Sequence, residues 1–288
     1  MLIFSLLLLI LSALCHAAWN IIARNTRDKI TFLWLQMIFM ILLLTLPVLI
    51  LFPLPPTEAL PTLLLSGIMQ GIYYLLLAKT YTLGDIEVVY PLTRGSAPVF
   101  VCLFSFLLGL EKITLPMFLS VLLIFAGIYI INMEQLDKYH LMAPFRTIIQ
   151  NPPVRLSLLN GIIVSIYSLS DSISVKYCSP IVVYYIIAVI PAVILLPLIL
   201  KRGKLKSEIQ NGTGRIAAVS VLTFAAYALV LFAMQFTSAS YSSSVREMSI
   251  IFVSLYSCAK MNRTSRIPKI LGAFLIFSGV FLLSLFRM

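Results

Sequence analysis

The sequence contains two related apolar stretches, PMFLSVLLIFAG at 116–127 and PKILGAFLIFSG at 268–279. Both begin with proline and end with glycine, and they share leucine, isoleucine and phenylalanine between them at a constant offset of 152. The same offset aligns Arg94 with Arg246. Leucine-rich segments match by chance, so the Arg, Pro and Gly pairs matter most. They predict that the chain is an internal duplication.

The composition indicates the environment in which these repeats fold. Of the 288 residues, 61% are hydrophobic and 11% are charged, whereas a soluble domain carries about 25% charged residues. This leaves too little polar surface for a soluble enzyme. A mean hydropathy of +1.05 also argues against a disordered or nucleic-acid-binding chain. We therefore predict a polytopic membrane protein whose partners are the lipid bilayer and a small-molecule substrate, with no nucleic acid.

No motif for catalysis or metal binding accompanies this composition. The four cysteines stand singly in apolar segments, without the spacing of a metal site. No H-E-x-x-H, G-x-S-x-G or P-loop pattern is present. We expect no enzymatic activity, no metal and no cofactor.

A helix needs about 20 mainly apolar residues to cross roughly 30 Å of hydrocarbon, and ten runs of this kind are present. They lie at 2–23, 30–52, 59–78, 87–109, 114–132, 156–176, 181–200, 216–236, 240–259 and 267–286. We predict an all-α membrane protein with a first five-helix repeat at 1–135, a central cytoplasmic linker at 136–154 and a second five-helix repeat at 155–288. Because five is odd, the two repeats must have opposite orientations, as in the inverted repeats of secondary transporters.

The loop charges support this topology. The loops after the first, third, fifth, seventh and ninth runs hold 16 Lys and Arg residues, whereas the other loops and the two termini hold 3. The alternative explanation is that the charges reflect random loop solvation. The positive-inside rule places the basic side in the cytoplasm, so we expect both termini outside, in a plasma (inner) membrane.

Ionisable residues inside apolar runs need an explanation, because each costs about 2.5–3.5 kcal/mol at the centre of a membrane helix. In the fourth run Glu87, Tyr90 and Arg94 share one helical face with two prolines. The ninth run contains Arg246 and Glu247 after a serine-rich segment. The arginines suit a carboxylate or phosphate, and inverted repeats would bring both to one central cavity. The alternatives are an Arg94–Glu87 pair that only fixes helix packing and serines that only allow close helix contact.

Further polar residues occupy matched places in the first and sixth runs. His16 and Asn20 are one turn apart, as are Tyr167 and Asp171. We expect Trp19, Asn20, Tyr167, Tyr74 and Tyr227 to contact substrate together with Tyr90, Arg94 and Arg246. His16, Asp171, Glu247 and Glu87 are candidates for proton coupling. The alternatives are ordinary aromatic packing and a histidine that only bonds neighbouring helices.

Several short motifs resemble the EamA-like branch of the drug/metabolite transporter superfamily. They are HAAWN at 16–20, VYPLTRG at 89–95 and VREMS at 245–249, together with the glycine-ending fifth and tenth runs. The resemblance covers all ten runs. It implies a ten-helix basket whose cavity is bounded mainly by the first, third, fourth, sixth, eighth and ninth helices. It also implies export or exchange of metabolites by alternating access.

Two features depart from the family pattern. Family repeats commonly place an acid before their last helix; Glu111 keeps this feature in the first repeat, but Arg263 stands at the aligned place in the second. Relatives are also described with cytoplasmic termini, and here we follow the loop charges instead.

The leading hypothesis is a secondary transporter that exports or exchanges a small anionic or zwitterionic metabolite, with proton coupling as an option. A flippase for a lipid or lipid-linked sugar would use the same fold with a groove open to the bilayer. A non-transporting scaffold or sensor would instead pair the arginines with acids in a closed interior. The sequence is compatible with a homodimer.

Overall fold

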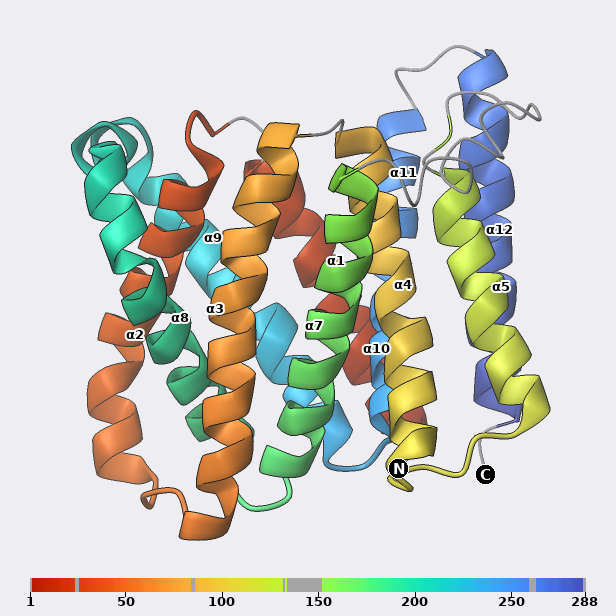
Figure 1. The fold of residues 1–288 in the computed structure, drawn as a ribbon, viewed down its shortest axis with the longest axis horizontal. Helices are drawn as coiled ribbons and strands as arrows, with labels where there is room; N and C mark the ends of the chain where they lie inside the picture. The colour runs from red at the N-terminus through yellow and green to blue at the C-terminus, as the bar shows by residue number, and fades with distance from the viewer. Residues whose placement is uncertain are drawn as a thin grey trace. The chain divides into compact units, whose positions relative to one another are not determined.

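The computed structural model describes residues 2–23, 26–83, 86–131, 133, 152–258 and 263–286. Within these residues it contains eleven α-helices and one short 3-10 helix, with no strand (Figure 1). In chain order they are α1 (Leu2–Ala23), α2 (Lys29–Leu51), η1 (Thr57–Ala59), α3 (Leu60–Leu83), α4 (Ile86–Leu107), α5 (Leu115–Ile131), α7 (Pro152–Ser174), α8 (Pro180–Arg202), α9 (Leu205–Met234), α10 (Ala239–Arg246), α11 (Met248–Cys258) and α12 (Arg263–Leu285).

Each predicted apolar run coincides with a helix, except 240–259, which contains two. Among the described residues, seven helices are long and apolar enough to cross a membrane, and α4 and α5 contain shorter apolar stretches. The all-helical membrane architecture is therefore confirmed, and the count of ten crossings remains a prediction. The described helix α9 starts earlier than expected, at residue 205, and its backbone leaves the helical conformation at Gly212. Its membrane-compatible part, Gly212–Met234, contains most of the predicted run.

Local sequence explains several helix boundaries. Asp28 caps the N-terminus of α2 by accepting a hydrogen bond from the Thr31 N–H, and Ser238 caps α10 in the same way through the Tyr241 N–H. Gly203 ends α8 with a φ of 61°, a left-handed conformation that glycine adopts without strain. These polar residues interrupt the apolar sequence where the chain must turn.

The chain forms two compact units. Unit 1 consists of residues 1–75 and 166–237, and unit 2 of residues 76–165 and 238–288. With the offset of 152, each unit contains equivalent helices from both sequence repeats: α2 and α8 in unit 1, for example, and α5 and α12 in unit 2. The units therefore group the chain by contact and not by repeat. The repeat boundaries at 135 and 155 remain a prediction.

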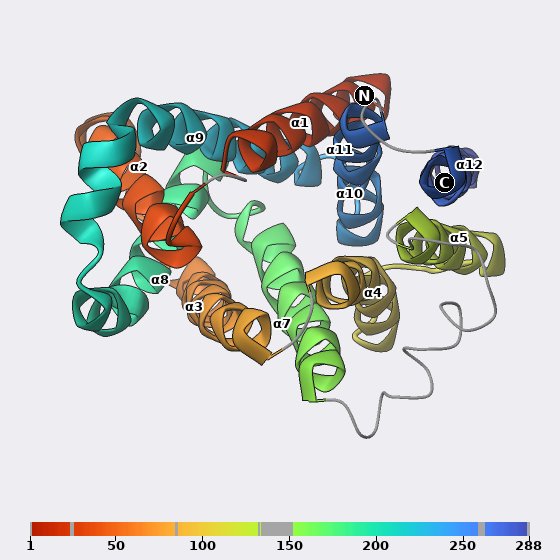
Figure 2. The same cartoon turned by 90° about the horizontal axis from the view of Figure 1, so that it is seen from above.

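Within unit 2, α5 and α12 lie side by side (Figures 1 and 2) and make reciprocal contacts. A Cβ atom built on Gly127 would lie 2.7 Å from the backbone nitrogen of Ile276, and one built on Gly279 would lie 3.0 Å from that of Ile124. Gly127 corresponds to Gly279 and Ile124 to Ile276 at the offset of 152. The two contacts are therefore related by a local two-fold axis. The helices are antiparallel, as an inverted repeat requires.

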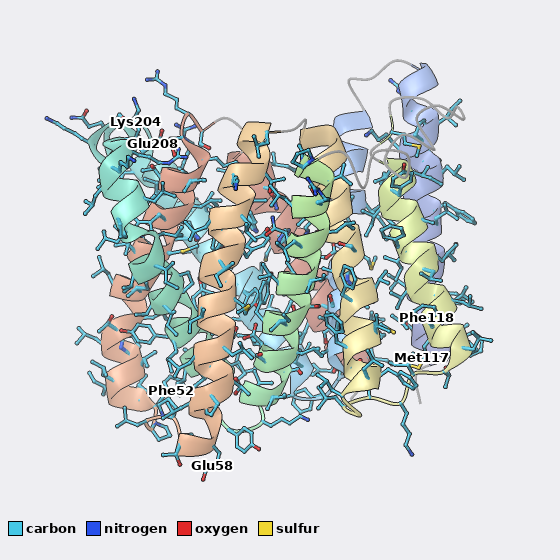
Figure 3. All side chains as sticks on the ribbon, in the orientation of Figure 1. Phe52, Glu58, Met117, Phe118, Lys204 and Glu208 are labelled. Atoms are coloured by element: carbon cyan, nitrogen blue, oxygen red, sulfur yellow. The ribbon has the colours of Figure 1, made fainter. Side chains whose placement is uncertain are left out.

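The connections at one end of unit 1 are tied together. The Arg202 guanidinium at the end of α8 donates to the Asp28 carboxylate at 2.7 Å, and the Asp28 N–H donates to Glu208 of α9 at 3.0 Å. Figure 3 shows Lys204 and Glu208 at this end, with Phe52 and Glu58 at the other. The loops after the first and seventh predicted spans thus share one end of unit 1, as the charge rule requires.

Unit 2 follows the same rule. Lys269 of α12 donates to the carbonyl oxygen of Ile131, the last residue of α5, at 2.6 Å. At the other end of these helices, the Ser240 N–H in the first turn of α10 donates to Glu111 in the connection between α4 and α5, at 3.2 Å. The membrane side to which each end belongs remains a prediction from the loop charges.

Candidate functional site

In unit 2 the two equivalent arginines converge on one acid. The Nε of Arg94 lies 3.4 Å from Oε2 of Glu247, and the Nε of Arg246 lies 3.9 Å from Oε1 of the same carboxylate. Arg246 is 4% exposed and Glu247 is fully buried. Among these three residues, positive charges outnumber negative charges two to one. The predicted meeting of Arg94 and Arg246 is therefore present within unit 2, whereas the cavity expected around it remains a prediction.

The chain is not a continuous helix at this acid. The single run predicted over 240–259 is two helices, α10 and α11, and Glu247 joins them with a ψ of −9°. The Glu247 N–H donates to the carbonyl oxygens of Ser244 and Val245, and not to the carbonyl oxygen four residues earlier, as it would in a regular α-helix. A short break of this kind inside a membrane helix is typical of transporter binding sites, where it turns backbone groups and side chains toward a substrate.

The hydrogen bonding of this cluster is incomplete. At 3.4 and 3.9 Å the two ion pairs are too long for hydrogen bonds, and the buried Nε and Nη2 of Arg246 have no hydrogen-bond acceptor among the described residues. Both Glu247 oxygens likewise lack a donor within the described chain. Buried polar atoms normally have partners, because each missing bond costs about 1–3 kcal/mol. A bound polar ligand or water would supply the missing bonds.

Unit 2 has a further buried polar side chain that the sequence reasoning missed. Asn160 of α7 is fully buried, and neither its amide nitrogen nor its amide oxygen has a hydrogen-bond partner within the described residues. The next residue, Gly161, packs against Ser96 of α4. The amide itself was the available signal, although it stands in a run that also contains several serines.

In unit 1, Asp171 of α7 is the centre of a hydrogen-bonded group. The hydroxyls of Ser66 on α3 and Tyr227 on α9 donate to its two oxygens, each at 2.5 Å. Asp171 is fully buried. Sequence reasoning selected Asp171 and Tyr227, and the structure joins them, whereas the role of Ser66 was missed because a lone serine in an apolar helix gives no signal.

Several tyrosines of unit 1 make ring contacts with one another. Tyr73 makes edge-on ring contacts with Tyr74 at 5.2 Å and with Tyr167 at 6.2 Å between centroids. Tyr184 of α8, which the sequence reasoning also missed, lies 6.3 Å from Tyr227 by the same measure. The predicted residues Tyr74 and Tyr167 thus both neighbour Tyr73, and Tyr227 neighbours Tyr184.

The polar residues of α1 bond mainly to each other. The Asn20 amide donates to Nδ1 and to the carbonyl oxygen of His16, at 3.0 and 2.8 Å. The Trp19 ring lies 5.0 Å from the His16 ring and packs beside a buried apolar cluster that includes Phe32 and Val219. These two bonds lie within α1 and do not test whether His16 bonds a neighbouring helix or carries a proton, so both readings remain predictions. The side chains of Tyr90 and Glu87 lie outside the described residues.

These features define an integral membrane protein built from two related helical repeats. The sequence model of the EamA-like transporter family matches residues 3–133 and 152–285, one match for each repeat. The chain belongs to this family, and the resemblance inferred from its motifs is confirmed.

Among the solved structures similar to this chain is a protein crystal structure with a TM-score of 0.62 and 13% sequence identity over 98% of this chain and 96% of that one. At this identity the likeness concerns the fold alone. No curated protein matches the sequence.

Proposed function

We propose that this protein is a secondary transporter that exports or exchanges a small anionic or zwitterionic metabolite by alternating access. Its family supports the transport of small molecules. The observation that carries the finer proposal is the cluster of Arg94, Arg246 and Glu247. Two equivalent arginines share one buried carboxylate, and two buried nitrogen atoms of Arg246 have no acceptor among the described residues.

The chemistry of this cluster favours an anion. A guanidinium offers donors in a planar fork that matches the two oxygens of a carboxylate or phosphate. Glu247 approaches both arginines without forming a hydrogen bond to either, so an incoming anion gains bonds that Glu247 does not make. The low polarity of the membrane interior strengthens such charge-assisted bonds. The anionic group of the substrate would therefore bind Arg94 and Arg246.

The scaffold alternative expects the arginines to be compensated in a closed interior. The ion pairs with Glu247 agree with that idea in part. They do not account for the helix break beside Arg246, or for the two nitrogen atoms of Arg246 that have no acceptor in the described part of the chain. The proposal also includes further residues that would contact the substrate: Tyr90, Trp19, Asn20, Tyr167, Tyr74 and Tyr227. The candidates for proton coupling are His16, Asp171, Glu247 and Glu87.

The test measures binding and transport in the same variants. Purified protein is screened by thermal shift against carboxylates, phosphorylated metabolites and amino acids, and a stabilising compound is then used for counterflow in proteoliposomes. Arg94→Gln and Arg246→Gln should each weaken binding about tenfold or more, because a hydrogen bond to a charged group contributes about 1.5–3 kcal/mol, and both should lose transport. Arg215→Gln, at an exposed arginine of α9, is the matched control.

Native transport rates in both arginine variants would disprove the assignment. Movement of a fluorescent lipid between leaflets, without uptake of any soluble compound, would instead favour the flippase. A protein that binds nothing in the screen and transports nothing would favour the scaffold.

A further inference from the structure

The helix break of unit 2 contains several buried polar atoms that lack hydrogen bonds. They belong to four side chains that are each at most 4% exposed: Ser243, Ser244, Arg246 and Glu247. The atoms are both serine hydroxyl oxygens, two nitrogen atoms of the arginine and both carboxylate oxygens, none of which has a partner among the described residues. Buried polar atoms normally have partners, because an unmade bond leaves their desolvation uncompensated. A polar ligand would supply the missing bonds.

The two serines differ from buried serines elsewhere in the described helices. Ser120, Ser157 and Ser220 each donate to the carbonyl oxygen four residues earlier, at 2.7, 2.8 and 2.6 Å. Such a bond satisfies a hydroxyl group inside its own helix. Ser243 and Ser244 do not make it, and no other partner in the described part of the chain replaces it. Their hydroxyls can therefore bond a ligand.

Helical spacing places these groups together. Ser243 precedes Arg246 by three residues and Glu247 by four, so the three side chains share one face of α10. Glu247 itself keeps a right-handed helical conformation at the end of α10. About one turn of the chain thus presents donors, hydroxyls and an acceptor carboxylate, all within unit 2.

A ligand that completes this set needs both acceptors and a donor. The two nitrogen atoms of Arg246 only donate, so they require an acceptor, whereas the carboxylate of Glu247 only accepts and requires a donor. A simple anion such as acetate has acceptors alone and would bring a second negative charge beside Glu247 without a bond to it. An anion that carries its own hydrogen-bond donor satisfies both residues.

The two arginines determine which kind of donor fits. The Nε atoms of Arg94 and Arg246 lie 3.4 and 3.9 Å from the Glu247 carboxylate. An ammonium group that donates to this carboxylate would lie close to both guanidinium groups, and like charges at such a distance repel strongly in a low-polarity interior. A neutral hydroxyl donates without this repulsion. The geometry therefore favours a hydroxyl over an amine.

We propose that Arg246 and Glu247 together bind an anion that carries a neutral hydroxyl beside its charged group, as in a hydroxy acid or a hydrogen phosphonate. The ionised oxygens accept from Arg246, the hydroxyl donates to Glu247, and Ser243 and Ser244 bond further ligand oxygens. The inference rests on the proposed function and narrows its substrate class from anions and zwitterions to hydroxyl-bearing anions. Because the four side chains are buried, the ligand reaches them in another state of the transport cycle.

The first test compares acetate, glycolate and glycine, which share one carbon frame and differ by a hydrogen, a neutral hydroxyl and an ammonium group. Their affinities for the full-length protein in detergent are measured by thermal-shift titration, with sodium chloride at equal ionic strength as the salt control. Glycolate should bind about tenfold or more tightly than acetate, the usual contribution of one hydrogen bond to a charged group. It should also bind more tightly than glycine.

A second pair of probes has a tetrahedral anion. Near pH 6, about where phosphate groups take up their second proton, methylphosphonate retains a hydroxyl and methanesulfonate does not. Methylphosphonate should therefore bind more tightly than methanesulfonate. A preference in one pair only would support the proposal and identify the hydroxyl as one on carbon or one on phosphorus.

Variants of Glu247 test whether this residue accepts the hydroxyl. Glu247→Leu removes the acceptor, so glycolate and acetate should bind within about twofold of each other, and acetate should bind more tightly than it does to the native protein because a nearby negative charge is gone. Glu247→Gln keeps a neutral acceptor and should reduce the preference for glycolate about threefold or more. Ser243→Ala should weaken glycolate binding about threefold. Glu208→Gln, at a buried acid of unit 1, is the matched control and should keep the native preference within about twofold.

The proposal is overturned if the native protein shows no preference in either pair, or if glycine binds more tightly than glycolate. Melting temperatures show which variants fold, and a native preference in a folded Glu247 variant overturns it as well. Equal binding of all anions that is lost in Arg246→Gln would remove this inference and leave the proposed function standing. A protein that binds no anion would contradict both.

Discussion

The contact between α5 and α12 predicts a specific sensitivity to one added methyl group. A Cβ atom at Gly127 would lie 2.7 Å from the backbone nitrogen of Ile276 and 2.8 Å from the carbonyl oxygen of Gly272. Non-bonded heavy atoms prefer about 3.5–4.0 Å, and both obstacles are backbone atoms that no rotamer change can move. In Gly127→Ala the two helices must therefore separate by several tenths of an ångström.

Overpacking of this kind costs about 1–3 kcal/mol, which corresponds to about 2–4 °C in melting temperature per kcal/mol for a large chain. Gly279→Ala should lose a similar amount, because its Cβ would meet Ser120 and Ile124 of α5 in the equivalent geometry. The double variant should lose less than the two single losses together. The first substitution already separates the helices, so the second meets less resistance.

The assay is thermal unfolding in detergent followed by intrinsic fluorescence. Gly214→Ala is the control, because a Cβ there would have no neighbour within 4 Å and alanine favours a helix over glycine by about 0.5–1 kcal/mol. It should be neutral or slightly stabilising. If Gly127→Ala is as stable as Gly214→Ala, or if Gly279→Ala is harmless where Gly127→Ala is not, the reciprocal contact is refuted.

Two further predictions concern the ends of the units. Burial raises the pKa of Asp28, but hydrogen bonds from Thr31 and Arg202 lower it by more, so its pKa lies below the ordinary 3.8. The stability from this ionised group is complete above pH 3.8 and is lost as the pH falls through the lowered pKa. Asp28→Asn keeps the helix cap and should lower the stability by about 0.2–1 kcal/mol at pH 7. The difference in melting temperature between this variant and the native protein should shrink below pH 3.8. A difference that does not change with pH would contradict this prediction. Glu111→Ala should destabilise the protein by about 0.5–2 kcal/mol, because it loses the bond to the Ser240 N–H at the start of α10. Glu111→Gln retains an acceptor oxygen and should unfold close to the native temperature. Equal losses of stability in the two variants would show that the charge of Glu111, and not its capping bond, is the contribution.

The sequence was sufficient for the helices and for the duplication. A membrane requires long apolar runs with satisfied backbone bonds, so helix positions follow from composition. The offset of 152 identified Arg94 and Arg246 as equivalent, and the structure brings both to one acid. The role of Glu111, visible as a family feature in the sequence, became clear only from its bond to Ser240.

Other parts of the site depend on contacts between distant helices. The partner of Asp171 on α3 is a serine, and serines occur throughout the apolar runs for packing reasons. Tyr184 lies in a run whose composition indicates only a membrane helix. The break at Glu247 was missed because the serine-rich segment and the apolar residues after it together have the length of one span. Such features depend on which helices pack together, and the sequence of a single apolar run does not specify its neighbours.

The acid of the arginine cluster shows how a duplicated scaffold acquires a site that is not symmetric. Duplication supplies both Arg94 and Arg246 at once, and with them two positive charges. The residue equivalent to Glu247 is Gly95, where a Cβ would already lie 3.1 Å from Phe125 and 3.2 Å from Ile128 of α5. A glutamate there would require the Phe125 and Ile128 side chains to shift. In the second repeat the helix is broken at the equivalent place, and the longer side chain lies between the arginines. The cluster therefore has one acid for two arginines, and two buried nitrogen atoms of Arg246 have no acceptor among the described residues.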